Sequence, residues 1–162
     1  MATMREVYLV GVNHVYQLGP YSGSPMFADS PLAPFEEFDA FLRSALTSHD
    51  IYGIAEEMSR AGLKKHFRSG ASMPCRLATA LNLPHRYCNP DPEMRRALNI
   101  TSDSEREKYW IKELISFDTF PVLFVLGANH IDSFERLLRE SGFQPLIIAR
   151  DWSASSDPAD TI

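Results

Sequence analysis

Two short runs of consecutive apolar residues constrain the fold of this 162-residue chain more than any other feature. They cover residues 7–10 and 122–126, and neither run alternates between apolar and polar positions. A strand with one face in water alternates in this way, whereas a strand covered on both faces reads as an unbroken apolar run. We therefore predict buried strands over residues 5–12 and 121–126, the second of them central.

Further strands and helices are predicted to alternate along the chain. Strands are expected at residues 50–56, 84–88 and 145–149, and helices at residues 35–47, 58–67, 71–81, 102–116 and 131–141. This order is typical of a compact α/β domain with a mostly parallel sheet of about four to five strands flanked by helices. We expect one domain over residues 1–152, with a long loop rich in Pro, Gly and Ser at 16–34, and a disordered tail at 153–162.

The composition disfavours several classes of partner. The chain has 16 Lys and Arg against 21 Asp and Glu, so it lacks the basic balance of a general nucleic-acid binder. No apolar run reaches the roughly 18 residues of a membrane span, and the first six residues lack the pattern of a signal peptide. Cys75 and Cys88 are too few for a disulfide framework, so we expect two buried free thiols, a cytoplasmic location, and no nucleic-acid or membrane partner.

One motif occurs twice, each time directly after a predicted buried strand. Residues 11–14 and 127–130 both read Gly-x-Asn-His, and the positions around them pair apolar with apolar. Gly11 and Gly127 would let the backbone turn or approach a ligand closely, while His14 and His130 would project over the carboxyl edge of the sheet. Because imidazole commonly binds divalent metals, we predict His14 and His130 as metal ligands.

The strand at 50–56 would bring a carboxylate to the same edge through Glu56 or Glu57. Adjacent residues on a strand face opposite ways, so only one of the two should point into the site. Two histidines and a carboxylate form a plausible open metal site, with the other glutamate as general base or supporting partner. Structural alternatives remain: each histidine alone would suit a hydrogen-bonded strand end, and one glutamate could complement the dipole of a helix that opens there.

The order of these motifs resembles the TraB/Tiki/ChaN-like superfamily, which groups with erythromycin-esterase-like proteins. The matching positions are Gly11 and His14, Glu56 or Glu57, Arg106, Gly127 and His130, and Gly142-Phe143, all in order. Residues 85–91 look like a segment of a small bacterial subgroup with this layout. The resemblance implies a compact α/β fold with a polar cleft lined by His and Glu, and functions that range from metal-dependent peptidase to esterase-like hydrolase to haem-iron binding.

The leading hypothesis is a small hydrolase, dependent on a divalent metal ion, that acts on a small-molecule or peptide substrate. Glu56, Glu57, Arg106 and His85 are its candidate catalytic residues, and Gly11, Gly127 and Asp91 its candidate cofactor-binding residues; the predicted metal ligands are His14, His130 and Glu56.

Other interpretations stay open. Arg106 would equally suit an ion pair on the surface of its helix, and His85 and Asp91 could serve turn structure around the nearby prolines. His and Glu could also activate water without a metal. A protein that binds a metal, haem or a small ligand without turnover is the alternative from another class. Nucleophilic cysteine chemistry at Cys75 or Cys88 is the weakest option, although Cys75 stands near a helix start that could lower its pKa.

Overall fold

The computed structural model of the chain describes residues 4–19, 32–66 and 70–155. In this part of the chain five strands form one sheet: β1 (Arg5–Val12), β2 (Gly53–Glu56), β3 (His85–Tyr87), β4 (Val122–Gly127) and β5 (Phe143–Trp152). All neighbouring strands are parallel, and their order is β3-β2-β4-β1-β5. The predicted α/β class is confirmed, and β4 occupies the centre of the sheet as its apolar run indicates.

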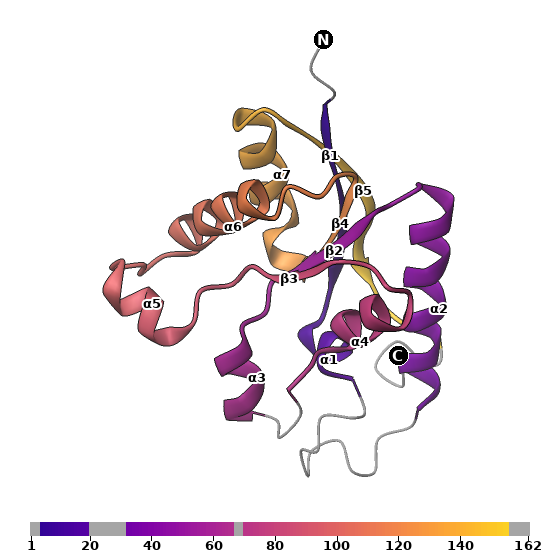
Figure 1. The fold of residues 1–162 in the computed structure, drawn as a ribbon. Helices are drawn as coiled ribbons and strands as arrows, with labels where there is room; N and C mark the ends of the chain where they lie inside the picture. Colours follow the sequence, from indigo (N-terminus) through magenta and orange to yellow (C-terminus); the bar gives the residue numbers. More distant parts are fainter. Residues whose placement is uncertain (1–3, 20–31, 67–69, 156–162) are drawn as a thin grey trace.

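Helices cover both faces of the sheet (Figure 1). The helical segments are α1 (His14–Leu18), α2 (Ala33–Ser48), α3 (Arg60–His66), α4 (Met73–Ala80), α5 (Pro92–Ala97), α6 (Asp103–Phe117), the short 3-10 helix η2 (Ala128–His130) and α7 (Ile131–Glu140). Helices α1, α2 and α4 pack on one face, whereas α6 and α7 pack on the other. Among the described residues no helix has both the length and the apolar character needed to cross a membrane.

The side chains of β4 show why its sequence does not alternate. Leu123 and Val125 pack into the apolar cluster beneath α2 and α4, while Phe124 and Leu126 pack into the cluster beneath α6 and α7. All four are fully buried. A strand between two helical layers needs apolar side chains at every position, and this need produces the unbroken run in the sequence.

Local signals set the ends of two helices on the second face. The Ser102 hydroxyl accepts a hydrogen bond from the backbone N–H of Glu105 at 3.1 Å, so Ser102 caps the start of α6. Gly142 adopts φ +88°, a left-handed conformation that suits glycine, and it ends α7 as predicted. These two helices carry Arg106 and the segment after His130, so their placement determines the geometry at the edge of the sheet.

Three local differences separate the structure from the sequence predictions. Residues 14–18, partly assigned to a loop, form α1, while the remainder of that loop at 20–31 lies outside the described residues. Residues 92–97 form α5, because proline is tolerated in the first turn of a helix. In the predicted tail, Ala154 is fully buried and its N–H donates to the Tyr16 hydroxyl at 3.1 Å; residues 156–162 lie outside the described part.

Candidate functional site

The strand order brings the two Gly-x-Asn-His motifs together. β1 and β4 are parallel neighbours, with Val12 opposite Gly127, so both motifs leave the sheet at the same edge. His14 follows β1 at the first position of α1, and His130 follows β4 at the end of η2. β2 is the other neighbour of β4 and ends at this edge as well. The sequence prediction that two imidazoles and an acidic residue meet at this edge is confirmed in the described residues.

Glu57 lies at the centre of this cluster. Its Oε1 is 3.6 Å from His14 Nε2, and its Oε2 is 3.6 Å from His130 Nε2. The same carboxylate accepts hydrogen bonds from Arg106 Nη2 at 2.5 Å and from the Gly127 N–H at 2.8 Å. Its side chain is 4% exposed. The guanidinium and the backbone N–H stabilise the buried charge of Glu57. The two imidazole nitrogens lie too far from the carboxylate for a direct hydrogen bond.

Gln17 determines how His14 presents its ring. Gln17 Nε2 donates to Glu56 Oε1 at 3.0 Å and to the Glu57 carbonyl oxygen at 3.3 Å, so its Oε1 must be the atom that faces His14. His14 Nδ1 therefore donates to Gln17 Oε1 at 2.6 Å. In the neutral ring the lone pair is then on Nε2, the nitrogen that faces Glu57. The His14 side chain is 46% exposed, so part of the ring is accessible to solvent.

His130 has a different environment. Its Nδ1 lies 2.9 Å from Glu107 Oε2, an oxygen that also accepts a hydrogen bond from the Ser133 hydroxyl. The hydrogen bond to Glu107 and the nearby charge of Glu57 raise the pKa of His130, against the opposing effects of burial and Arg106. His130 therefore favours its protonated form more than an ordinary histidine does, and its side chain is only 5% exposed.

Arg106 joins the cluster from α6. Besides Glu57, it donates to Asn89 Oδ1 at 3.2 Å and to Asp103 Oδ1 at 3.0 Å. The alternative interpretation of Arg106 paired it with acidic neighbours on its own helix, and Asp103 fulfils that role in part. Its contact with Glu57 joins segments 49 positions apart. One arginine thus ties α6 to the edge of the sheet while it neutralises the central carboxylate.

Glu56 points to the opposite face of the sheet, as the alternation of a strand requires. It is fully buried and accepts hydrogen bonds from Gln17, Ser72 at 2.5 Å and His85 at 2.6 Å. The structure therefore does not group Glu56 with His14 and His130 as predicted, and Glu57 lies between the two rings instead. Neither glutamate opens a helix, since α3 begins only at Arg60.

The remaining polar candidates lie at the His85 side of this edge. His85 and Asp91 line a cavity of about 250 Å³ that also includes Tyr87 and Asn89. Asp91 Oδ1 accepts a hydrogen bond from the Ala61 N–H at 3.1 Å, a contact that fits the structural alternative. Asn89 connects this cavity to the cluster, because its side chain also contacts Arg106.

The two motif glycines have different reasons to lack a side chain. A Cβ on Gly11 would lie 2.2 Å from the Arg150 carbonyl oxygen, so Gly11 permits the close approach of β5 and does not border the cluster. A Cβ on Gly127 would lie 2.9 Å from Asn129 Oδ1, 3.0 Å from His14 Nε2 and 3.3 Å from Glu57 Oε1. Gly127 thus lets three polar atoms approach its backbone closely, and of the two glycines only Gly127 borders the cluster.

This difference predicts unequal effects of alanine. Gly11→Ala should lower the free energy of unfolding by about 1–3 kcal/mol, because backbone atoms of β5 must move. Gly127→Ala should lower the free energy of unfolding less. The atoms that its Cβ would meet belong to the outer ends of side chains, which can shift. Urea titrations of both variants, with intrinsic fluorescence as the signal, measure the two losses. Equal losses, or a larger loss for Gly127→Ala, would contradict this assignment.

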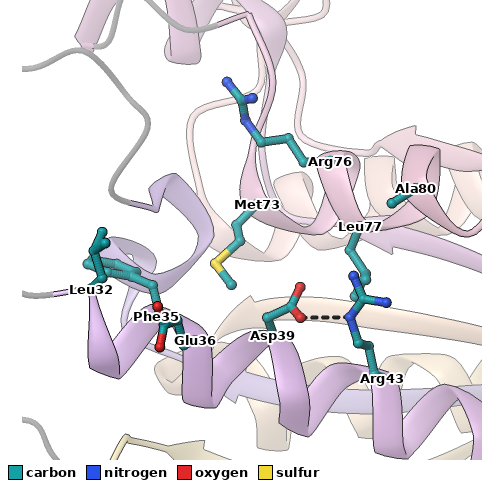
Figure 2. A pocket seen from close by; sticks show the side chains of 9 residues that line it. All are labelled: Leu32, Phe35, Glu36, Asp39, Arg43, Met73, Arg76, Leu77 and Ala80. Atoms are coloured by element: carbon teal, nitrogen blue, oxygen red, sulfur yellow. Dashed lines mark hydrogen bonds and ion pairs between the residues drawn. The ribbon is translucent and has the colours of Figure 1, made fainter.

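A second hollow lies away from the cluster, between α2 and α4 (Figure 2). Its volume is about 340 Å³, and its wall combines apolar side chains such as Phe35 and Met73 with the Asp39–Arg43 ion pair. None of its lining residues belongs to the Glu57 cluster. The candidate site is therefore defined by the convergence of polar side chains and not by this hollow.

The donor atoms of this cluster decide whether it could hold a metal ion as it is arranged. Within residues 4–19, 32–66 and 70–155, no group of three or more His, Cys, Asp or Glu side chains has an arrangement that could hold a metal ion. The guanidinium of Arg106 already lies against Glu57 at 2.5 Å, where a divalent cation would compete with it. The side chains as they are arranged do not fit a metal, so we derive no chemical step through one.

Several partners in this cluster were not predicted from the sequence. Gln17 follows His14 at a helical spacing of three, a signal that was missed because the segment was interpreted as a loop. Glu107 was not among the predicted site residues, yet it is buried and contacts His130. Ser72 and Asn89 lie far from their partners in sequence, and no local pattern indicates them.

Comparisons with known protein families, with curated proteins and with solved structures find no match to this chain. The resemblance to the TraB/Tiki/ChaN-like superfamily therefore stays a prediction.

Proposed function

We propose that the chain is a small hydrolase in which His14, Glu57, His130 and Arg106 form the reactive site. The supporting observation is the position of the two Nε2 atoms, each 3.6 Å from a different oxygen of the same carboxylate. This separation exceeds a direct hydrogen bond and leaves each nitrogen able to bind a third molecule. A water placed beside the gap between His14 and Glu57 could reach both groups at once.

His14 is the general base of this proposal. Gln17 fixes its Nδ1–H, so Nε2 can accept a proton from water as the water attacks the substrate. Glu57 orients the water and stabilises the imidazolium that forms. Because Gly127 has no side chain, His14 Nε2 and Glu57 Oε1 can both lie close to its backbone, beside the place proposed for the water.

His130 and Arg106 supply positive charge on the other side of the carboxylate. The pKa of His130 is raised by its hydrogen bond to Glu107, so the ring can act as a proton donor to a leaving group. Arg106 offsets the charge of Glu57 and adds to the positive potential that a developing anion would meet. The proposed substrate is a small ester, amide or phosphoester whose reacting group reaches the exposed side of His14.

The metal-dependent form of the proposal differs in one respect. In that form His14, His130 and Glu57 would hold a divalent ion, and Arg106 would have to leave Glu57. Loss of metal from His14→Ala and His130→Ala, measured on purified protein by elemental analysis, would support this form. Absence of a stoichiometric metal from the wild type would argue against it.

A binding protein without turnover is the second candidate. Glu57 and His130 are only 4% and 5% exposed, so little of the cluster other than His14 faces solvent. This enclosure suits a small ligand that remains bound. A ligand that copurifies with the protein, together with no hydrolysis of any substrate tested, would favour this candidate.

A substrate screen tests the hydrolase directly. Purified protein should hydrolyse at least one member of a panel of chromogenic esters, peptides and phosphoesters, and turnover should survive exhaustive chelation because the derived mechanism uses no metal. Glu57→Gln provides the matched variant, since it keeps the shape of the side chain but loses the charge. Turnover that disappears on chelation and returns with an added divalent ion would overturn the metal-free form. Equal turnover in Glu57→Gln would contradict the proposed site.

A further inference from the structure

The cavity of about 250 Å³ beside His85 lies where β2 and β3 end. Its wall includes Ser59 and Arg60, which follow β2, and Asn89 and Asp91, which follow β3. In parallel α/β sheets, ligands commonly bind beyond the carboxyl ends of the strands. The volume is below the range of cavities that hold drug-sized molecules, so this cavity suits a smaller ligand.

Two basic side chains in the wall already have acidic partners. His85 Nε2 lies 2.6 Å from Glu56 Oε2, and Arg86 Nη1 lies 3.0 Å from Glu113 Oε2. Neither glutamate lines the cavity itself. Each pair therefore leaves little net charge for a ligand to meet.

Arg60 and Asp91 differ from these two pairs. Both line the cavity, yet within the described ranges neither forms an ion pair with the other or with any further residue. The Arg60 guanidinium lies 5.9 Å from the centre of the Tyr87 ring, and Asp91 Oδ1 accepts a hydrogen bond from the neutral Ala61 N–H. A simple anion would be attracted by Arg60 and repelled by Asp91, and a simple cation would meet the reverse. A ligand with one group of each sign would pair with both.

Two neutral donors border the same cavity. Asn89 Oδ1 accepts from Arg106 and from Trp110 Nε1, which can only donate, so the amide NH₂ is the end left for the cavity. Ser59 is 7% exposed, and its hydroxyl accepts from the Gly62 N–H at 3.0 Å. Among the residues that the structure describes, none accepts the hydroxyl proton of Ser59 or a proton of the Asn89 amide. Buried donors in folded proteins are nearly always satisfied, so these two need an acceptor oxygen from a ligand or from water.

Part of the wall is apolar. Met94, on α5, lines the cavity although its side chain is 42% exposed, and Tyr109 adds an aromatic ring from α6. Methionine is flexible and adapts to apolar groups of different shapes. The wall can therefore accommodate an apolar group beside the two charged ones.

We propose that this cavity binds a small zwitterion, an α-amino acid with an apolar side chain. Arg60 pairs with its carboxylate, which also accepts hydrogen bonds from Ser59 and Asn89. Asp91 pairs with its ammonium group, and its side chain packs on the apolar part of the wall. This binding site is separate from the Glu57 cluster and does not depend on hydrolysis.

Titrations with free amino acids test the cavity in the full chain. L-leucine, L-methionine and L-phenylalanine are each added to isotope-labelled protein while the amide chemical shifts are followed. At least one should bind with a Kd of about 10 mM or tighter, and the shifts should centre on residues 59–62 and 89–94. No saturable shift with any of the three, or shifts centred elsewhere, would overturn the proposal.

Analogues of the tightest binder isolate each charge. Its amide lacks the carboxylate charge, and its 2-hydroxy acid has a hydroxyl in place of the ammonium group. Each should bind about threefold to fivefold more weakly, the effect of losing one partly solvated ion pair. Inorganic phosphate, a simple anion, should also bind more weakly than the amino acid. Equal or tighter binding of either analogue or of phosphate would contradict a zwitterion site.

Variants assign the two charges to their residues. Arg60→Gln should raise the Kd of the amino acid about threefold to fivefold without weakening its amide, and Asp91→Asn should do so without weakening the hydroxy acid. Arg96→Gln and Glu93→Gln, matched changes at exposed positions of α5 outside the cavity wall, should leave every Kd unaltered. An unchanged Kd in Arg60→Gln or Asp91→Asn would refute the assignment. These titrations measure no turnover, so this proposal and the hydrolase can fail separately.

Discussion

Glu57→Ala should lower the free energy of unfolding by about 3 kcal/mol, the largest loss of stability expected for a single change at this site. The substitution leaves the Arg106 guanidinium and the Gly127 N–H without the carboxylate that now accepts from both. Arg106 keeps its contacts with Asn89 and Asp103. The loss of stability should therefore lie near the lower end of the range for a broken buried ion pair. Urea denaturation followed by tryptophan fluorescence measures the change.

Glu113→Ala is the matched control for this measurement. Glu113 also pairs with an arginine, Arg86, at 3.0 Å, but the two side chains are 25% and 33% exposed. A partly solvated pair contributes at most about 1 kcal/mol, so this variant should stay close to the wild type. If Glu57→Ala cost no more than Glu113→Ala, the central role of Glu57 in the cluster would be refuted.

His14→Ala should reduce hydrolytic turnover by about 10²- to 10⁴-fold, the range expected for the loss of a general base. The fall should appear in kcat more than in KM, because His14 acts on water and not on the bound substrate. Stability should change far less than in Glu57→Ala, since the His14 side chain is 46% exposed. Steady-state kinetics on the best substrate from the screen, with a urea titration of the same preparation, tests both statements.

His49→Ala serves as the control for His14. His49 is exposed at the end of α2 and packs against the Tyr8 ring, so turnover should remain at the wild-type level. A His14→Ala variant that kept more than about a tenth of wild-type turnover would remove His14 as the base.

Most of the fold could be predicted because buried strands are recognisable in the sequence by their apolar residues. β4 is apolar at every position since helices cover both of its faces, and β1 has the same character. Segments governed by local chemistry were harder to assign. α5 was missed because two prolines close together, at 90 and 92, favour an irregular chain, although the second of them occupies a first-turn position where no N–H is needed.

The candidate site was predicted in part for a similar reason. Repetition of Gly-x-Asn-His revealed His14 and His130, and the strand order required to bring them together follows from parallel pairing of β1 with β4. The sequence could not show whether Glu56 or Glu57 faces the two histidines. The direction of a side chain at the end of a strand depends on the exact residue at which the strand ends. Gln17 was missed because its segment was interpreted as a loop, and Glu107 because its contact with His130 joins residues 23 positions apart.

The amide of Gln17 has a consequence for how the two sides of β2 share protons. It touches His14 through its oxygen and Glu56 through its nitrogen, and thereby joins two titratable groups from opposite faces of the sheet. Unlike a carboxylate, a hydroxyl or a water molecule, an amide does not readily take up a proton on one side and release another. Gln17 therefore fixes the orientation of both side chains but does not relay a proton from one to the other.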